Sequence, residues 1–411
     1  MAKAKPRKPH RALRTVAIIL SVLLVLEAAY CFLVFTDIPA IKNLREAYIE
    51  TALATMSHHW MATYFLPNYQ IRNVAQRMEI ARINQGDKVS DRDPTAPPAT
   101  DSNGEPIPTE PVFPTVDPSL PEADRFYALF WELDRSSFAA YVQQHPEALS
   151  DGWDNIYINE AGLDDDGTEI YTTMGEQVLA IDAKNGILLL RVTGTGYRGV
   201  LAVAKDPSQL RCVAAGSIGS YGQKLGNIVR HGNGILGITG SGFIDEGGVG
   251  NGGTIAGYTM CEGVSYGTHY TAYGYKRIEL TRDNHMYIAN ANTPVADDVT
   301  DAVEFWPAII VDGKLATSSF DGWNGIQPRA CIGQSANGEI LMLVVEGRQV
   351  QSVGITIENC AYILQRHNAY NAMNLDGGTS AVMWFNGEYV TQCSNGDSRY
   401  LPNAWVYGYN E

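Results

Sequence analysis

The first strong pattern in the chain is a nearly unbroken apolar run from Thr15 to Phe35. About 20 apolar residues are what a helix needs to cross the hydrocarbon core of a membrane. A cleaved signal peptide is the alternative, but the run is long for one and no small-x-small cleavage pattern ends it. We therefore expect an uncleaved transmembrane anchor over 15–35. The basic residues of 1–14 then place that tail in the cytoplasm and the chain after residue 36 outside the cell membrane.

The segment between this span and the main domain changes pattern twice. Residues 41–83 mix charges with Leu, Ala, Met and aromatic side chains and break at Leu66-Pro67-Asn68, so we expect two helices within a membrane-proximal segment over 36–90. Residues 91–122 are rich in Pro, Thr, Asp and Glu and cannot bury enough apolar surface to fold, which predicts a disordered linker. A short helix over 123–144 is expected within a helical lead-in over 123–153.

The remaining residues, 154–411, consist of short β-rich runs separated by glycine turns. Val, Ile and Leu dominate four of these runs, which favours strands: 178–182, 186–192, 199–203 and 340–345. Thr356 is expected to cap a helix with apolar residues at i, i+3, i+4 and i+7, and a strand over 372–375 follows it. The fold class is therefore predicted as α+β, a mixed β-sheet domain with flanking helices and a βαβ crossover, preceded by one transmembrane helix and membrane-proximal helices.

The crossover brings two acidic residues to one edge of the sheet. A strand, a helix and a strand within about 30 residues make the two strands parallel, so both end at the same edge. Glu346 follows the first strand and Asp376 follows the second, and ligands tend to bind at such an edge. Gly347 and Gly377-Gly378 let the chain turn sharply after each acid. Asn386-Gly387 between 381–385 and 388–390 then predicts a hairpin.

Composition narrows the choice of partner. The chain has a formal net charge of −15 although its first 14 residues carry six basic side chains and no acid. An acidic remainder argues against nucleic acid, since phosphate backbones bind clustered Lys and Arg. Five widely spaced cysteines lie outside the span and form neither a disulfide framework nor a zinc-binding pattern. No metal site is expected at His58-His59 or at Asp164-Asp165-Asp166. The sequence identifies no cofactor, and it does not exclude a divalent metal ion elsewhere.

Several separated motifs resemble, in order and spacing, those of the phosphodiester glycosidase family of uncovering-enzyme-like and exopolysaccharide-related domains. The motifs are Pro328-Arg329-Ala330-Cys331-Ile332-Gly333-Gln334, Glu346-Gly347-Arg348-Gln349, Ser352-Val353-Gly354 and Asn374-Leu375-Asp376-Gly377-Gly378. Three upstream motifs are also similar: Phe305-Trp306-Pro307-Ala308, Gly250-Asn251-Gly252-Gly253-Thr254 and Ile238-Thr239-Gly240-Ser241-Gly242-Phe243. With them, the resemblance covers about residues 176–410. The resemblance implies an enzyme that cleaves a sugar from a glycosyl phosphodiester.

Two positions depart from the family pattern. The family's usual Asn-Gly-Gly-Phe sequence is replaced by Gly240-Ser241-Gly242-Phe243, so no role of that Asn side chain carries over to this chain. A third glycine and two serines usually follow the family's Asp, where this chain has Thr379-Ser380-Ala381.

The residues then suggest a division of roles. A departing phosphate is already a stable anion, so the site mainly needs a carboxylate for the oxocarbenium-like sugar and fixed cations for the phosphate. We expect Asp376 to act as nucleophile or base with Glu346 as second carboxylate, their roles being exchangeable, and Arg329 and Arg348 to hold the phosphate. Further expected substrate contacts are Asn374, Gly377, Gly378, Ser380, Gly240, Gly242 and Asn251, and His231, His269 and His285 are weaker candidates.

Two readings of the arginines and three of the function remain open from sequence. Arg329 with Glu346, or Arg348 with Asp376, could instead form ion pairs that only tie the sheet edge together. The leading function is a membrane-anchored hydrolase of envelope polysaccharide that binds a glycan or sugar phosphodiester. The alternatives are a sugar-phosphate transferase in polysaccharide assembly and a non-catalytic glycan-binding protein.

Overall fold

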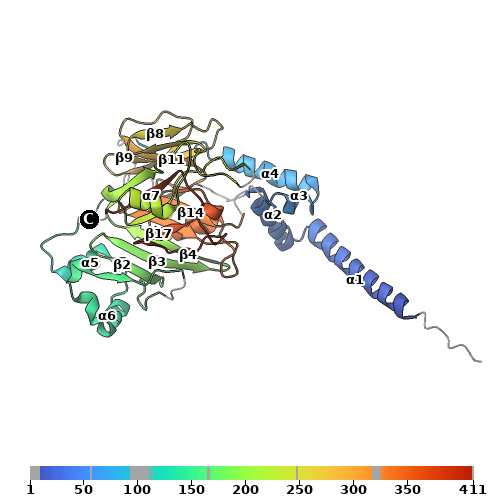
Figure 1. The fold of residues 1–411 in the computed structure, drawn as a ribbon, viewed down its shortest axis with the longest axis horizontal. Coiled ribbons are helices and arrows are strands. Elements are labelled where there is room, and N and C mark those ends of the chain that lie inside the picture. The colour runs from blue at the N-terminus through green and yellow to red at the C-terminus, as the bar shows by residue number, and fades with distance from the viewer. Residues whose placement is uncertain are drawn as a thin grey trace, which may run out of the picture.

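The computed structural model describes residues 10–55, 58–92, 111, 113, 115–163, 167–246, 249–316 and 325–409. Most of the predicted basic tail, most of the predicted linker and the acidic turn at 164–166 lie outside these residues. Figure 1 shows one long helix projecting from a body of strands, with three shorter helices at its base. The account below concerns these described parts.

The projecting helix and its neighbours form the N-terminal part. They are α1 (His10–Phe35), α2 (Pro39–Leu53), α3 (Trp60–Thr63) and α4 (Asn68–Ile83). By length and composition alone, Leu13–Phe35 is able to cross a membrane. The predicted break is confirmed, since Pro67 precedes the first residue of α4. A third, short helix, α3, lies where two helices were predicted.

The predicted single helix over 123–144 is wrong, because the chain forms α5 (Glu122–Leu129) and α6 (Arg135–Gln144) instead. Leu133 pairs with Thr172 in an isolated β-bridge and thereby pulls the chain out of a helical path. The side chain of Asp134 accepts a hydrogen bond from the Ser137 N–H and caps the second helix.

Three antiparallel sheets build the body. The nine-stranded sheet has the order β1-β2-β3-β4-β15-β14-β16-β12-β13. Its strands are β1 (Tyr157–Asn159), β2 (Gln177–Asp182), β3 (Ile187–Gly194), β4 (Tyr197–Ala204), β12 (Ala308–Val311), β13 (Lys314–Leu315), β14 (Arg329–Ser335), β15 (Ile340–Val345) and β16 (Ala369–Asn374). The strands predicted at 178–182, 186–192, 199–203 and 340–345 are confirmed as β2, β3, β4 and β15.

The other two sheets have five strands each. One runs β10 (Met286–Asn290), β9 (Lys276–Thr281), β11 (Val299–Phe305), β7 (Tyr258–Cys261) and β8 (Val264–Gly267). The other runs β18 (Glu388–Tyr389), β17 (Met383–Phe385), β6 (Leu236–Thr239), β19 (Asn403–Tyr407) and β5 (Leu210–Ala214). The predicted hairpin is confirmed as β17 and β18, which pair through Trp384 with Tyr389 and Phe385 with Glu388.

The βαβ crossover is present, but its two strands are separated in the sheet by a third strand, β14. β15 leads into α8 (Ile357–Arg366), whose N-cap Thr356 accepts a hydrogen bond from the Asn359 N–H as predicted, and α8 leads into β16. β14 pairs antiparallel with both β15 and β16, so those two strands run parallel to each other without being neighbours. The α+β class is thus confirmed, and every hydrogen-bonded strand pair in the described residues is antiparallel.

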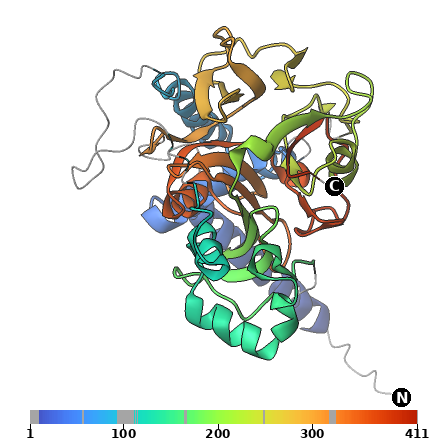
Figure 2. The same ribbon diagram turned by 90° about the vertical axis from the view of Figure 1, so that its left-hand side faces the viewer.

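Two apolar layers sandwich the nine-stranded sheet and explain the unbroken apolar run of β15. Ile340, Met342 and Val344 point into the layer shared with the two five-stranded sheets. Leu341, Leu343 and Val345 point into the layer shared with α8, α5 and α6. Alternate side chains of a strand face opposite sides of a sheet, so a strand covered on both sides is apolar throughout. Figure 2 shows α5 and α6 at one end of the body and the sheet of β7–β11 at the other.

Candidate active site

The ends of β15 and β16 meet at one edge of the large sheet, with the start of β14 between them. Val345 pairs with Arg329 in the register of β14 and β15. Beyond β16, the Leu375 N–H donates to the Ala330 carbonyl at 2.8 Å and the Gly378 N–H to the Pro328 carbonyl at 2.9 Å. Glu346 and Asp376 therefore emerge at the same edge, as the crossover predicts. Their backbones are two strand spacings apart, about 10 Å.

The carboxylate of Asp376 lies among polar groups from separate stretches of the chain. Burial raises its pKa to about 6, against hydrogen bonds from Ser380 and Gly377 and the positive charge of Arg399, while the charge of Asp245 adds to the rise. Ser380 thus keeps a hydroxyl on the carboxylate despite the departure at 379–381. A carboxylate that is ionised at neutral pH but readily protonated has the properties of a general base or nucleophile.

Arg399 and Asp245 form a bidentate ion pair beside Asp376, and neither was predicted from the sequence. The guanidinium donates to both carboxylate oxygens of Asp245 at 2.8 and 2.9 Å, and to the Gly250 carbonyl at 3.0 Å. Burial alone would raise the pKa of Asp245, but the hydrogen bonds from Arg399 and Gly250 hold it below its ordinary value. Neighbouring carboxyls whose pKa values are pushed in opposite directions are typical of acid–base sites.

Arg348, in the turn after β15, places its guanidinium against Gly378, two residues beyond Asp376. Its backbone has φ +60°, a left-handed conformation that side-chain-bearing residues rarely adopt. Hydrogen bonds from the Arg348 and Gln349 N–H groups to Val353 and Ser352 fix this turn. A Cβ atom on Gly378 would lie 3.4 Å from the guanidinium, so the glycine leaves room for it. Such backbone strain is often found at functional sites.

Glu346 is buried at the same edge but is held differently. One carboxylate oxygen accepts a hydrogen bond from the Gln392 N–H at 2.8 Å, and the other, Oε2, is buried without a hydrogen-bond partner among the described residues. Burial raises the pKa of Glu346, and this rise is only partly offset by Gln392, Arg198 and Arg191. The group is therefore shifted toward the protonated form, and one of its buried oxygens has no hydrogen-bond partner among the described residues.

Arg329 does not join this cluster, contrary to its expected place beside the phosphate. Its guanidinium donates to the carbonyls of Gly325 at 2.9 Å and Ile355 at 3.4 Å. The groups that interact with it electrostatically are Cys360, Cys331 and Glu50, and the two cysteines lie in the apolar layer between the sheet and α8. The reason is strand alternation, since Arg329 faces the same side as Cys331 and opposite to Ala330.

Asn374 and the early glycine segments serve mainly to hold the backbone. Asn374 donates to the Trp306 carbonyl at 2.9 Å, while its own carbonyl oxygen is buried without a partner among the described residues. Asn251 is exposed, donates to Ser220 and accepts from the Gly253 N–H. Gly242 lies against the ring of Phe305, to which its Cβ would come within 3.1 Å.

The side chain of Asn403 explains why this chain has Gly240-Ser241 where the family usually has Asn-Gly. A Cβ atom at position 240 would lie 1.9 Å from the side-chain oxygen of Asn403, so no side chain fits there. That oxygen accepts from the Ser241 N–H at 2.8 Å, and the Asn403 amide donates to the Ser241 hydroxyl at 2.7 Å. A carboxamide carried by β19 therefore occupies the space next to Gly240, although the sequence of the motif contains none.

An acidic and aromatic wall borders Asp376 on the side of β7–β11. Glu304 is fully buried, accepts from the N–H groups of Tyr258 and Tyr270 at 3.0 and 2.9 Å, and pairs with His269. Burial raises the pKa of Tyr270, and the negative charges of Asp376 and Glu304 add to that rise. The ring of Tyr270 meets that of Trp306 edge-on at 6.2 Å. Aromatic faces of this kind suit the apolar faces of sugar rings.

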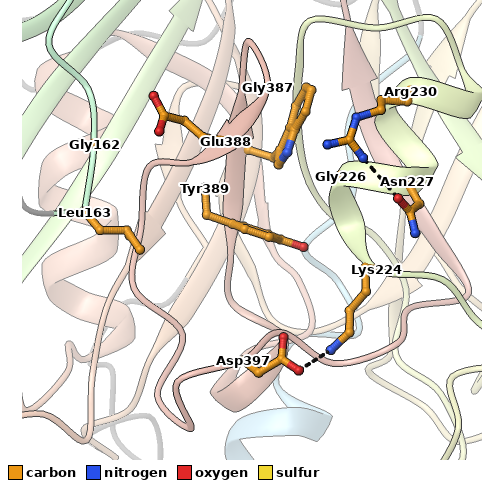
Figure 3. A pocket seen from close by; sticks show the side chains of 11 residues that line it. Gly162, Leu163, Lys224, Gly226, Asn227, Arg230, Gly387, Glu388, Tyr389 and Asp397 are labelled. Carbon is orange, nitrogen blue, oxygen red and sulfur yellow. Dashed lines mark hydrogen bonds and ion pairs between the residues drawn. The ribbon is translucent and has the colours of Figure 1, made fainter.

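A groove of about 600 Å³ lies between α7 (Leu225–His231) and the β17–β18 hairpin. Figure 3 shows the Tyr389 ring reaching from the hairpin toward α7, which carries Asn227 and Arg230. Lys224 binds Asp397 at 2.8 Å across the groove, and Asp397 is two residues from Arg399. Among the residues with described positions, no three His, Cys, Asp or Glu side chains group as a metal site would require.

Comparisons with known proteins agree with the motifs. The phosphodiester glycosidase family matches residues 232–407. The SPbeta prophage-derived uncharacterized protein YomE of Bacillus subtilis (strain 168) is 27% identical over 168 residues, 38% of this chain and 26% of that protein. N-acetylglucosamine-1-phosphodiester alpha-N-acetylglucosaminidase of Bos taurus is 35% identical over 80 residues, 19% of this chain and 15% of that protein. The chain thus matches about a quarter or less of these relatives' length.

Solved structures are similar over about half of the chain. The zebrafish N-acetylglucosamine-1-phosphodiester alpha-N-acetylglucosaminidase catalytic domain, auto-inhibited by its pro-peptide, aligns with a TM-score of 0.43 at 15% identity, covering 55% of this chain and 82% of that one. A hypothetical protein from Synechocystis aligns with a TM-score of 0.40 at 14% identity, covering 56% and 63%. The stretch that the phosphodiester glycosidase family matches, residues 232–407, contains Glu346, Arg348 and Asp376, in agreement with the resemblance of the sequence motifs.

Proposed function

We propose that the protein is a membrane-anchored extracytoplasmic hydrolase that cleaves a sugar from a glycosyl phosphodiester of cell-envelope polysaccharide. The observation that carries the proposal is the cluster at Asp376, in which a carboxylate with a pKa of about 6 lies beside the guanidinium of Arg399, while the guanidinium of Arg348 lies against Gly378 in the turn that follows. A glycosyl phosphodiester offers a sugar carbon that becomes cationic and a phosphate that leaves as an anion. The carboxylate supplies a negative charge for the sugar carbon, and the guanidinium groups supply positive charge for the phosphate.

In the proposed reaction, the ionised Asp376 stabilises or attacks the anomeric carbon as its bond to the phosphate oxygen breaks. Ser380 and Arg399 orient this carboxylate. The exposed guanidinium of Arg348 takes the developing phosphate charge in a bidentate contact, which Arg geometry favours. No strong acid is needed for the leaving group. A water molecule, activated by a carboxylate, completes the hydrolysis.

Glu346 is the second carboxylate of the proposal. Its raised pKa and its unpartnered Oε2 suit a group that exchanges a proton with water or with a sugar hydroxyl. With Asp376 ionised at neutral pH and Glu346 shifted toward protonation, the two acids divide into a base and an acid. Arg329, in contrast, has no part in this chemistry, because its guanidinium is committed to backbone carbonyls on the other face.

The groove beside α7 supports a polymeric substrate. Its lining combines two cations, Lys224 and Arg230, with two carboxylates, Glu388 and Asp397, and Tyr389 adds an aromatic surface. A groove with hydrogen-bonding side chains of both charges and an aromatic ring suits the hydroxyl groups and apolar faces of further sugar units. The apolar span of α1 would hold such an enzyme at the cell envelope.

The pH dependence of the rate tests the role of Asp376. Because only the ionised carboxylate acts, kcat/KM should fall about tenfold per pH unit below about pH 6, near the pKa of Asp376. The measurement is the initial rate of diester cleavage between pH 4.5 and 8. A rate that stays constant through pH 6, or that rises toward acid, would remove Asp376 as nucleophile or base.

The substrate class is tested by a panel of sugar-1-phosphodiesters, offered to the purified protein with and without a chelator and with and without an acceptor glycan. The expected product is free sugar, formed equally when the acceptor is present. Transfer of the sugar to the acceptor would favour the sugar-phosphate transferase. Tight glycan binding without turnover across the panel would favour a binding protein.

A further inference from the structure

The membrane-proximal helices carry four exposed aromatic side chains. Trp60 is 46% exposed, Tyr64 78%, Phe65 55% and Tyr69 51%. They lie on α3, at the start of α4 and in the turn between them, and the ring of Trp60 lies 6.3 Å from that of Tyr64 and 6.4 Å from that of Phe65. Large aromatic side chains gathered on one segment without protein cover indicate an interaction surface.

This aromatic segment is fixed to the outer end of the apolar helix α1. The Tyr30 hydroxyl of α1 donates to the Phe65 carbonyl at 2.6 Å, and Gln70 donates to the Val34 carbonyl at 2.8 Å. From α2, Arg45 donates to the carbonyls of Leu33 and Thr36 at 2.8 and 3.1 Å. These contacts place the four aromatic residues at the level where α1 ends, and the apolar side chains of α1 are exposed over most of its length, Val34 near its end being buried.

We infer that Trp60, Tyr64, Phe65 and Tyr69 form a bilayer-binding surface that sits in the interfacial region of the outer leaflet. Trp and Tyr prefer this depth, because their rings are apolar while their N–H and O–H groups bond to water and headgroups. The occupant is a lipid bilayer, since the surface continues directly from the apolar face of α1. The inference rests on the membrane anchor of the proposed function but not on its chemistry.

The same helices connect the bilayer to the catalytic edge of the sheet. The Ile326 N–H, just before β14, donates to the Thr51 hydroxyl of α2 at 2.9 Å. Thr51 is the thirteenth residue of α2, about 18 Å along the helix from its start. At the other end of the module, Arg82 of α4 lies 5.1 Å from the Tyr275 ring, which stacks on Tyr270 beside Asp376. The bilayer-binding surface therefore holds the site close to the membrane.

Tryptophan quenching by bromine-labelled lipid tests the surface. The full chain is reconstituted into phosphatidylcholine vesicles whose acyl chains carry bromine near the headgroup, and integration is checked by flotation after a carbonate wash. The apolar helix contains no tryptophan, so quenching reports only on residues outside it. The wild-type chain should be quenched, and Trp60→Phe should lose at least half of that quenching.

Trp131→Phe is the matched control, because Trp131 is 40% exposed but follows α5, which Figure 1 places at the far end of the body from α1. It should retain the wild-type quenching. A Trp60→Phe chain quenched as strongly as the wild type, or an integrated wild-type chain that is not quenched, would overturn the surface while leaving the anchor. A chain that the wash removes from the vesicles would overturn both, and neither result bears on diester cleavage.

Discussion

The Asp376→Asn protein should cleave a sugar phosphodiester at least about 1000-fold more slowly than the wild type, in line with removal of a residue that acts on the reacting atoms. Asparagine keeps the shape of the side chain but cannot carry the negative charge that the sugar cation requires. The measurement is kcat/KM at pH 7.5 on the best diester of the panel. A stable variant with the wild-type rate would contradict the catalytic assignment.

The stability of the same variant separates a functional carboxylate from a structural one. The pKa of Asp376 is raised from 3.8 to about 6, so its contribution to stability is fully present below about pH 4 and is lost as the pH rises through 6. At pH 7.5 the buried negative charge of Asp376 lowers the free energy of unfolding, and asparagine removes this charge. The midpoint of thermal unfolding should therefore not fall in Asp376→Asn, whereas a structural ion pair would lose stability.

Asp312→Asn provides the matched control. Burial also raises the pKa of Asp312, but this carboxylate lies in the β12–β13 turn and accepts a hydrogen bond from the Asp91 N–H. That turn faces the start of β16, through the bond from the Gly313 N–H to the Tyr370 carbonyl, and thus the opposite edge of the sheet from Asp376. The rate of diester cleavage should stay within about twofold of the wild type, since a substitution far from the cluster at Asp376 leaves the groups of that cluster in place.

Replacement of Arg348 by alanine should lower kcat by about 100- to 1000-fold, the usual cost of removing one fixed donor that stabilises developing charge. The guanidinium is exposed and close to Gly378, so its loss should not reduce the stability of the fold. Arg348→Gly should show the same loss of kcat with equal or greater stability, because glycine adopts φ +60° without strain. Steady-state kinetics and thermal unfolding measure both effects.

Two further variants make the Arg348 prediction specific. Arg348→Lys should recover part of the rate, since it restores the charge without the bidentate geometry. Arg282→Ala removes another exposed guanidinium, one that donates to the Asp297 carbonyl, and should leave the rate unchanged. If Arg348→Ala were as active as the Arg282→Ala control, Arg348 would have no role in holding the phosphate.

The sequence predicted the edge that carries the site because that prediction depends on local order along the chain. The apolar run of β15, the Thr356 cap and the strand before Asp376 are contiguous signals, and they are enough to bring Glu346 and Asp376 to one edge. The insertion of β14 between these strands is not visible locally, since strand order depends on pairing between distant segments.

The sequence could not predict which side chains surround Asp376. Arg399 and Asp245 are 154 residues apart, and no spacing rule joins them. Arg329 belongs to a conspicuous motif, yet its side chain points to the other face of the sheet. Side chains alternate along a strand, so the residue at which β14 begins determines the face to which Arg329 points. Glu304 had a local signal, because it directly precedes the Phe305-Trp306-Pro307-Ala308 motif.

The position of the broken bond is the most direct test of the central claim, that the cluster at Asp376 cleaves the sugar from the phosphate. The methyl diester of N-acetylglucosamine-1-phosphate, or the best diester of the panel, is hydrolysed in water labelled with oxygen-18, and both products are analysed by mass spectrometry. Cleavage between the anomeric carbon and oxygen places the label in the sugar and none in the phosphate, which the account predicts. Label in the phosphate would show attack at phosphorus and contradict it.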